Sequence, residues 1–210
     1  MKNLVILGAG ESGIGTALLG IDKGFEVFVS DYGRIKKEYK DVLKNYEIDW
    51  EEGKHTSSKI LNADIVIKSP GISDLVPIVK QLLSNGTPVI SEIEFASQFT
   101  SSKIIGVTGS NGKTTTTMMI YEILKNANIN VSIAGNIGNS FAKEIKKESD
   151  VFVLELSSFQ LDGITAFRPK IAIITNITPD HLDRYDNNFD NYVASKFRIA
   201  MNQTKSDYLI

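Results

Sequence analysis

A loop with the composition of a phosphate-binding loop begins at Val107, where the chain reads VTGSNGKTTTT. A strict Walker A pattern, G-x-x-x-x-G-K-[ST], needs glycine at that first position. The context is nevertheless right, because the loop lies between an apolar run and a helix-period segment and places Lys113 where its ammonium can reach phosphate oxygens. Gly109 and Gly112 supply a permissive backbone, and Thr114 offers a hydroxyl to Mg²⁺. We interpret the run as a variant phosphate-binding loop; the alternative is a polar turn that caps a helix.

A second glycine-rich loop lies near the start of the chain. Gly8, Gly10 and Gly13 fit G-x-G-x-x-G after a strand-like run and before a helix-period segment, and Asp31 ends the next predicted strand. Such glycines let backbone N–H groups approach a diphosphate at a helix N-terminus, while the carboxylate accepts a hydrogen bond from a hydroxyl or imide. The pattern favours a nucleotide or dinucleotide site over a tight turn that binds nothing, and it leaves the choice of nucleotide open.

Three further side chains could take part in chemistry. Glu155 lies near the end of the run VFVLEL, where a carboxylate at the carboxyl edge of a sheet could hold a metal near Thr114, unless it is only a surface residue of an edge strand. His181 follows another strand-like run, where a lone histidine is more often structural. Lys196 shares a helix face with apolar residues, so it must snorkel, pair or be modified. His55 lies in a polar loop, and we expect it to be solvated.

The elements that must position these residues alternate along the chain. Short β-rich runs alternate with helix-period segments, as in βα units packed on a parallel sheet. The pattern lapses in the small polar residues at 97–103, and we place a domain boundary there. The prediction is an α/β protein with a Rossmann-like domain in 1–98 and the first part of a P-loop ATPase-type domain in 99–210. The strand predictions are 4–7, 27–30, 64–71, 88–90, 104–107, 131–135, 151–156 and 171–175.

Bulk composition limits the classes of partner. A chain of 210 residues with 42% hydrophobic and 23% charged content is typical of a folded globular protein. Its net charge of −2 provides no basic field for nucleic acid or acidic lipid, and we expect neither as a partner. The absence of cysteine excludes disulfides, zinc–thiolate sites and thiol catalysis. No apolar run approaches the ~20 residues of a membrane span, so we expect a cytoplasmic protein.

The phosphate loop resembles the T-G-[ST]-N-G-K-[ST] loop of the Mur ligases, ATP-dependent enzymes that add amino acids to the UDP-linked peptidoglycan precursor. Folylpolyglutamate synthases carry a related loop. Four downstream runs resemble successive motifs of the D-glutamate-adding branch of the family, and ELSSFQL is the most discriminating part of them: AGNIG, LELSSFQL, TNITPDHLDRY and YVASKFRI. The resemblance spans essentially the whole chain, with both domains in the family's order.

The family also has the rest of the ATPase domain and a C-terminal domain. The last residues, DYLI at 207–210, look like the start of another buried strand, which would leave a βα pattern unfinished. We therefore expect an N-terminal fragment that lacks the C-terminal domain and the D-glutamate site and is inactive alone.

The resemblance implies roles for the matched positions. ATP would be bound by Gly109, Ser110, Asn111, Gly112, Lys113, Thr114 and Thr115. The UDP-linked substrate would be bound by Glu11, Ser12, Gly13, Asp31, Tyr32, Gly71 and Asn136, with Asp31 and Tyr32 at the uracil. Mg²⁺ would be held by Thr114, Glu155, His181 and Lys196. The catalytic residues would be Lys113, His181 and Lys196.

Several of these positions carry further implications of the resemblance. The family's lysine at position 196 carries a carbamate formed with CO₂, which binds a second Mg²⁺, and Ser195 stands here in place of the family's alanine. Asp180 and Arg184 match the same D-H-x-D-R motif as His181. Tyr32 departs from the small polar residue expected beside the aspartate.

The implied reaction transfers the γ-phosphoryl group of ATP to the carboxylate of UDP-N-acetylmuramoyl-L-alanine, after which the amine of D-glutamate attacks the acyl phosphate. The phosphate and the carboxylate are both anions and repel each other, so the reaction requires at least a lysine and Mg²⁺ to offset their charges. We expect a monomer. The alternatives are a non-catalytic nucleotide-binding module and a folylpolyglutamate-synthase-like ligase. An NAD-dependent oxidoreductase would leave the phosphate loop without a purpose.

Overall fold

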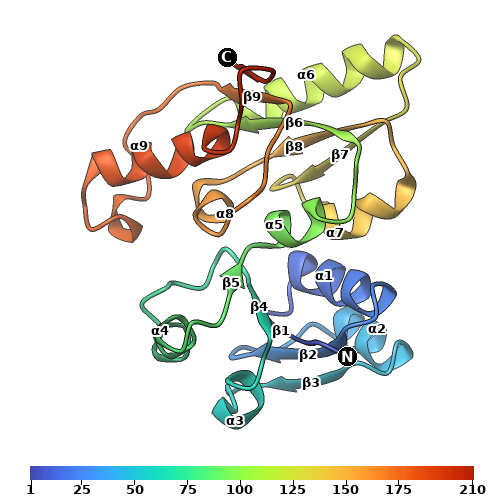
Figure 1. Ribbon diagram of the computed structural model, residues 1–210, viewed down its shortest axis with the longest axis vertical. Coiled ribbons are helices and arrows are strands. Elements are labelled where there is room, and N and C mark those ends of the chain that lie inside the picture. Colours follow the sequence, from blue (N-terminus) through green and yellow to red (C-terminus); the bar gives the residue numbers. More distant parts are fainter.

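All 210 residues are described by the computed structural model. The chain forms two five-stranded sheets, each made of parallel strands, and the second sheet follows the first along the sequence (Figure 1). The first sheet has the order β3-β2-β1-β4-β5, and the second has the order β10-β9-β6-β8-β7. The α/β prediction is confirmed. None of the helices combines the length and the apolar character needed to cross a membrane.

The first sheet is covered by helices on both faces. Its strands are β1 (Asn3–Leu7), β2 (Glu26–Asp31), β3 (Asp49–Glu52), β4 (Ile65–Lys68) and β5 (Val89–Ile90), and its helices are α1 (Glu11–Asp22), α2 (Lys37–Asn45), α3 (Ser57–Ile60) and α4 (Pro77–Ser84). Side chains alternate along β1, so that Leu4 and Ile6 pack with residues of α1 and α2, whereas Val5 and Leu7 pack with residues of α3 and α4. The chain leaves β1 toward β2 and returns on its other side to β4, which opens a crevice at the carboxyl ends of these strands.

The second sheet is also built around its first strand, β6, but the next strand, β7, lies at the edge of the sheet and not beside β6. Its strands are β6 (Lys103–Thr108), β7 (Val131–Gly135), β8 (Val151–Glu155), β9 (Ile171–Ile174) and β10 (Tyr208–Leu209). Its α-helices are α6 (Lys113–Asn126), α7 (Phe141–Glu144), α8 (Ser158–Asp162) and α9 (Phe189–Phe197), with 3-10 turns at Ile145–Lys147, Leu182–Arg184 and Arg198–Ala200. Because β6 lies between β8 and β9, the phosphate loop that follows it occupies the point where the strand order reverses.

One strand of the structure differs from the sequence expectations. Strand β3 was not predicted, because its letters DWEE are mostly acidic and show no apolar alternation. It adds to the edge of the first sheet by pairing with β2. At the other end of the chain, DYLI does form a strand beside β9 at the edge of the second sheet, and its apolar side chains are exposed on this uncovered edge.

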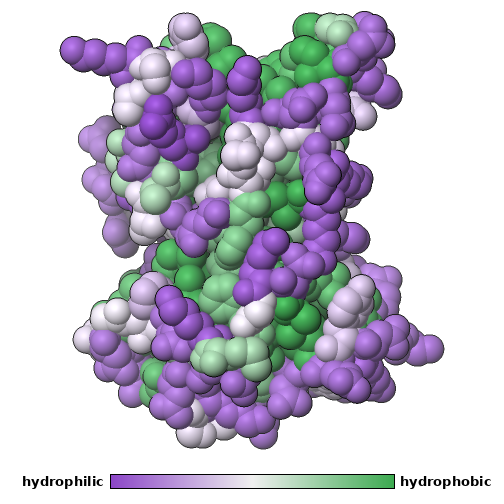
Figure 2. All heavy atoms as spheres, turned by 45° about the vertical axis from the view of Figure 1, so that its right-hand side comes forward, coloured by the Kyte–Doolittle hydropathy of each residue, from purple (hydrophilic) through white to green (hydrophobic).

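Helix α5 (Glu92–Ser97) joins the two halves of the chain and packs against elements of both (Figure 1). A single cluster of 29 buried hydrophobic residues extends from Leu4 in the first sheet to Ile199 beyond α9, so the core continues through this junction. Hydrophobic surface is also visible in the waist between the halves, framed by hydrophilic side chains (Figure 2). We propose residue 98 as the domain boundary, because α5 ends at Ser97 and β6 begins at Lys103.

A buried carboxyl group lies where α1 meets α7. The Oε1 atom of Glu92 accepts hydrogen bonds from Ser140 Oγ at 2.6 Å and from Ala142 N at 2.8 Å, while its Oε2 atom has no partner. The contact is close, since a Cβ atom on Gly15 of α1 would lie 2.0 Å from Ser140 Oγ. Burial raises the pKa of Glu92 more than these hydrogen bonds lower it.

This junction predicts a pH dependence of stability. Between the ordinary glutamate pKa of 4.5 and the raised pKa of the folded state, Glu92 is protonated in the folded protein and ionised in the unfolded chain. The free energy of unfolding therefore falls as the pH rises through this window. Glu92→Gln mimics the protonated acid and removes this loss. We expect the variant to gain stability over the wild type by up to about 1.4 kcal/mol per pH unit in that window. Denaturant unfolding from about pH 4 to pH 8 measures the difference.

The matched control is Glu122→Gln, because Glu122 lies on the exposed surface of α6 in an ion pair with Lys125. Its unfolding curve should follow that of the wild type at each pH. Equal pH dependence in the wild type and in Glu92→Gln would show that Glu92 is ionised in the folded protein.

Candidate functional site

The phosphate loop needs glycine at two of its positions. Gly109 has φ of 146° and Gly112 has φ of 79°, both in the region that L side chains rarely adopt. A Cβ atom on Gly109 would also lie 2.0 Å from Thr175 Oγ1. Gly112 then serves as the N-cap of α6, so the first turn of that helix follows the loop directly. The free N–H groups of this turn make it a place that favours an anion.

The loop is tied to the segment after β9 through its side chains. Ser110 is buried, and its Oγ atom donates to the carbonyl of Thr178 at 2.8 Å and contacts the Tyr192 hydroxyl at 3.0 Å. The backbone N–H of Asn111 donates to Asn176 Oδ1 at 3.0 Å. Ser110 therefore has a structural use, and its backbone N–H is also engaged, since it donates to the Asn176 carbonyl at 2.9 Å.

A buried carboxylate lies beside the first turn of α6. Thr114 Oγ1 donates to Glu155 Oε2 at 2.6 Å, and Asn136 Nδ2 donates to Glu155 Oε1 at 2.9 Å. Glu155 is 2% exposed and is brought there because β8 runs parallel to β6, with Val107 and Glu155 in register. A buried carboxylate whose side-chain partners are both neutral fits a cation as its missing counter-charge.

This donor set suits Mg²⁺ better than a metal that needs an all-protein cage. No group of three or more histidine, aspartate or glutamate side chains gathers anywhere in the chain. One carboxylate and one hydroxyl, from Glu155 and Thr114, leave the remaining positions for phosphate oxygens and water, as Mg²⁺ commonly takes them. Thr115 is exposed at the same helix turn.

Two lysines converge on the loop. Lys113 Nζ donates to the carbonyls of Gly109 and Ser110 at 2.9 Å each, and Lys196 Nζ donates to the same Gly109 carbonyl at 2.9 Å. Lys196 is 2% exposed and lies over the Tyr192 ring at 4.6 Å. Because its side chain is buried, Lys196 does not snorkel to the surface. It also has no carboxylate partner, so the pairing alternative is wrong in this structure as well. Burial, with a smaller contribution from the charge of Lys113, lowers the pKa of Lys196 to about 8.

His181 lies apart from these groups. It is exposed, its φ is 49°, and its Nε2 atom is 3.7 Å from Asp180 Oδ2. It makes no hydrogen bond or ion pair with Glu155 or Lys196. Arg184 instead connects the two halves, because its guanidinium stacks over Phe159 at 4.6 Å and donates to the carbonyls of Pro70 at 3.3 Å and Gly71 at 3.5 Å.

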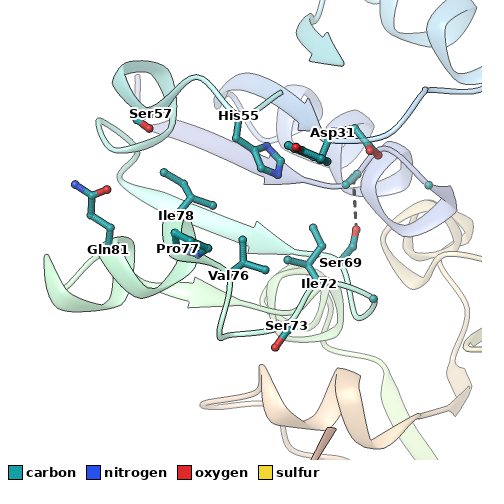
Figure 3. Close-up of a pocket in the computed structure, with 14 residues that line it drawn as sticks. Asp31, His55, Ser57, Ser69, Ile72, Ser73, Val76, Pro77, Ile78 and Gln81 are labelled. Atoms are coloured by element: carbon teal, nitrogen blue, oxygen red, sulfur yellow. Dashed lines mark hydrogen bonds between the residues drawn. The ribbon is translucent and has the colours of Figure 1, made fainter. Parts of the chain in front are cut away.

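A cavity of about 960 Å³ lies at the crevice of the first sheet (Figure 3). Of the predicted substrate residues, Asp31, Tyr32 and Gly71 line it. The Asp31 carboxylate accepts hydrogen bonds from Ala9 N and from Gly33 N at 2.7 Å each, so it also fixes the glycine loop.

Other predicted substrate residues take places around this cavity. Glu11, Ser12 and Gly13 form the first turn of α1 without lining the cavity, and Asn136 lies on the second sheet beside Glu155. A Cβ atom on Gly13 would lie 2.0 Å from the Gly8 carbonyl, which explains the third glycine of the motif.

Sequence reasoning missed several lining residues. Gly8 and Gly10 line the cavity, where the glycine motif placed a nucleotide site, whereas Ser69, Ile72 and Val76 were not expected there. His55 also lines it, half-buried, and the expectation that it is solvated is wrong. His55 was missed because β3 was not predicted. A strand at 49–52 would have placed the loop that follows it, which carries His55, at the carboxyl edge of the sheet.

Comparisons with known proteins agree along the whole chain. Residues 107–210 match the family described as Mur ligase middle domain, and residues 3–77 match the one described as MurD N-terminal domain. The chain is 61% identical over 210 residues to the UDP-N-acetylmuramoylalanine–D-glutamate ligase of Christiangramia forsetii, covering 100% of this chain and 47% of that protein. The chain belongs to the Mur ligase family. A second Mur ligase with the same name, from Bacteroides thetaiotaomicron, is 58% identical over 211 residues, covering 100% of this chain and 48% of that protein.

Solved Mur ligase structures share the fold. The UDP-N-acetylmuramate:L-alanyl-gamma-D-glutamyl-meso-diaminopimelate ligase from Neisseria meningitides has a TM-score of 0.66 at 20% identity, covering 100% of this chain and 70% of that one. The UDP-N-acetylmuramate-alanine ligase MurC from Thermotoga maritima has a TM-score of 0.60 at 24% identity, covering 96% and 47%. At these identities the likeness concerns the fold alone. The chain spans about half the length of the curated Mur ligases it matches.

Proposed function

We propose that this chain forms the nucleotide-substrate and ATP-binding part of a ligase that adds D-glutamate to UDP-N-acetylmuramoyl-L-alanine in peptidoglycan precursor synthesis. The observation that carries the proposal is the meeting of a glycine-bounded phosphate loop, buried Glu155 and buried Lys196 at one edge of the second sheet. The names of the high-identity relatives support the choice of D-glutamate over other amino acids.

The residues of the loop would divide the work of holding ATP. The N–H groups of the first turn of α6 and the ammonium of Lys113 would bind phosphate oxygens. Thr114 and Glu155 would hold Mg²⁺, which supplies positive charge to the phosphate oxygens when it is bound. Asn136, already hydrogen-bonded to Glu155, would orient that carboxylate and reach the substrate that bridges the two halves.

Lys196 has the environment that carbamylation requires. The reaction with CO₂ needs a neutral amine, and a lysine whose pKa is lowered to about 8 has a substantial neutral fraction near neutral pH. We propose that carbamylated Lys196, together with His181, holds a second Mg²⁺ near the reacting carboxylate. The same proposal implies a cytoplasmic, monomeric enzyme.

The reaction is tested in a protein extended to the length of the relatives. Phosphate release from ATP should require UDP-N-acetylmuramoyl-L-alanine and D-glutamate together. With hydroxylamine in place of D-glutamate, an acyl phosphate should be trapped as the hydroxamate of the UDP substrate. ATP turnover that depends on a folate and L-glutamate instead would assign the chain to the other ligase class.

Substrate binding can be measured on this chain itself. We expect calorimetric titration to give saturable binding of UDP-N-acetylmuramoyl-L-alanine and UDP, and none of NAD⁺. Asp31→Ala should weaken UDP binding by about tenfold or more, because the glycine loop loses the carboxylate that holds it. Asp41→Ala, at an exposed position on α2, is the matched control. Binding of NAD⁺ in place of UDP would overturn the ligase proposal.

A further inference from the structure

A histidine that no motif singles out projects into the cavity of the first sheet. The ring of His55 lies in the cavity wall near Asp31 (Figure 3), and its centroid is 5.8 Å from that of Tyr32. Its Nδ1 atom lies 2.7 Å from Ser30 Oγ, at the carboxyl end of β2. The imidazole is therefore anchored on one side, which leaves its Nε2 atom for another partner.

A chain of hydrogen bonds fixes the tautomer of this histidine. Ser30 is fully buried, and its Oγ atom donates to Glu51 Oε1 at 2.8 Å. Glu51 also accepts hydrogen bonds from Thr56 N at 2.7 Å and Thr56 Oγ1 at 2.5 Å. Burial raises the pKa of Glu51, but the hydrogen bonds from Thr56 and Ser30 outweigh that effect and lower the pKa overall.

An ionised carboxylate can only accept hydrogen bonds, so the single hydroxyl proton of Ser30 points to Glu51 at 2.8 Å in preference to the Lys54 carbonyl at 3.5 Å. The Ser30 oxygen must then accept from Nδ1–H of His55. In the neutral imidazole this leaves Nε2 without a proton, as a hydrogen-bond acceptor. Asp31, the other strong acceptor in the wall, already receives two backbone N–H groups, whereas His55 Nε2 has no partner in the protein.

We propose that His55 is a specificity-determining residue of the nucleotide site, and that its Nε2 atom accepts a hydrogen bond from the imide N–H of a uracil base lying in the cavity beside Tyr32. The inference rests on the proposed function, since it names the feature of the UDP substrate that this wall reads. Uracil presents a donor at its N3 position, whereas cytosine presents an acceptor there. A lone pair on Nε2 therefore favours the first base and opposes the second.

The tautomer can be observed directly, because the chain has only two histidines, His55 and His181. We expect ¹⁵N spectra of the labelled chain to show protonated Nδ1 and unprotonated Nε2 for the residue whose signals vanish in His55→Gln. Adding UDP should shift that Nε2 signal toward the hydrogen-bonded range. A proton on Nε2 in the free wild type would overturn the inference without any variant.

Binding selectivity provides the second measurement. We expect the wild type to prefer UDP over CDP by about tenfold or more, and His55→Leu to lose most of that preference through weaker UDP binding. His55→Gln should keep part of it, because its amide oxygen can reach the place of Nε2. Ser30→Ala should lower it, because the tautomer is then free to change.

The matched control is Ser132→Ala, which removes a buried serine hydroxyl bonded to Ser149 Oγ at 2.7 Å in the second sheet. Its UDP preference should equal that of the wild type. UDP binding with an unchanged Nε2 signal and an unchanged preference in His55→Leu would overturn the role of His55 alone. No binding of UDP by folded wild-type protein would overturn the proposed nucleotide site, and this inference with it.

Discussion

Lys196→Met is expected to abolish the proposed ligation in a protein extended to the length of the relatives, while leaving the folded chain at least as stable as the wild type. The side chain is buried, its ammonium has only the Gly109 carbonyl as a hydrogen-bond partner, and no carboxylate pairs with it. Replacing an unpaired buried charge with an apolar side chain of similar length is neutral or stabilising by roughly 1–3 kcal/mol. A residue kept for its packing would show the opposite pattern.

The loss of activity should be large because Lys196 lies at the phosphate loop. Groups that stabilise charge during phosphoryl transfer commonly account for about 10³-fold or more in rate. Hydroxamate formation and phosphate release in the extended protein measure this loss, and denaturant unfolding measures stability. Lys125→Met, at an exposed position on α6, is the control and should retain full activity. Near-normal turnover by Lys196→Met would remove Lys196 from the catalytic proposal.

Glu94→Ala is expected to be among the most destabilising single substitutions in the chain. The buried carboxylate of Glu94 accepts hydrogen bonds from the backbone N–H groups of Thr165 at 2.9 Å, Ala166 at 3.0 Å and Phe167 at 2.8 Å. Thr165 Oγ1 adds a further bond at 3.0 Å. These bonds fasten α5 to the segment after α8, and their loss leaves several donors without an acceptor.

We expect the free energy of unfolding to fall by roughly 3–5 kcal/mol in Glu94→Ala, measured by urea denaturation. Glu94→Gln retains one acceptor oxygen and should lie between this variant and the wild type. Glu122→Ala, which removes an exposed carboxylate, should change stability by less than about 0.5 kcal/mol. A loss below about 1 kcal/mol in Glu94→Ala would mean that the junction is held by apolar packing alone.

The strands and the phosphate loop could be read from the sequence because their causes are local. Buried parallel strands are continuous apolar runs, and all eight predicted runs contain strands of the structure. The loop depends on glycines next to Lys113, and the positive φ angles of Gly109 and Gly112 agree with that reading. The position of Lys196 on an apolar helix face was also evident from spacing, although only the structure showed that its side chain is buried and does not snorkel.

Only the tertiary structure decided which groups meet across the chain. Strand β3 has no apolar alternation, because it is an edge strand held by pairing with β2, and without it His55 could not be placed in the cavity wall. Glu92 and Glu94 lie two residues apart on one short helix, yet one bonds at Ser140 and the other at Thr165. These hydrogen-bond partners are far apart in the sequence, and a buried hydrogen bond produces no periodic pattern of residues that could predict it. The local sequence therefore determined most of the helices and strands, whereas tertiary packing determined β3 and the contacts between elements.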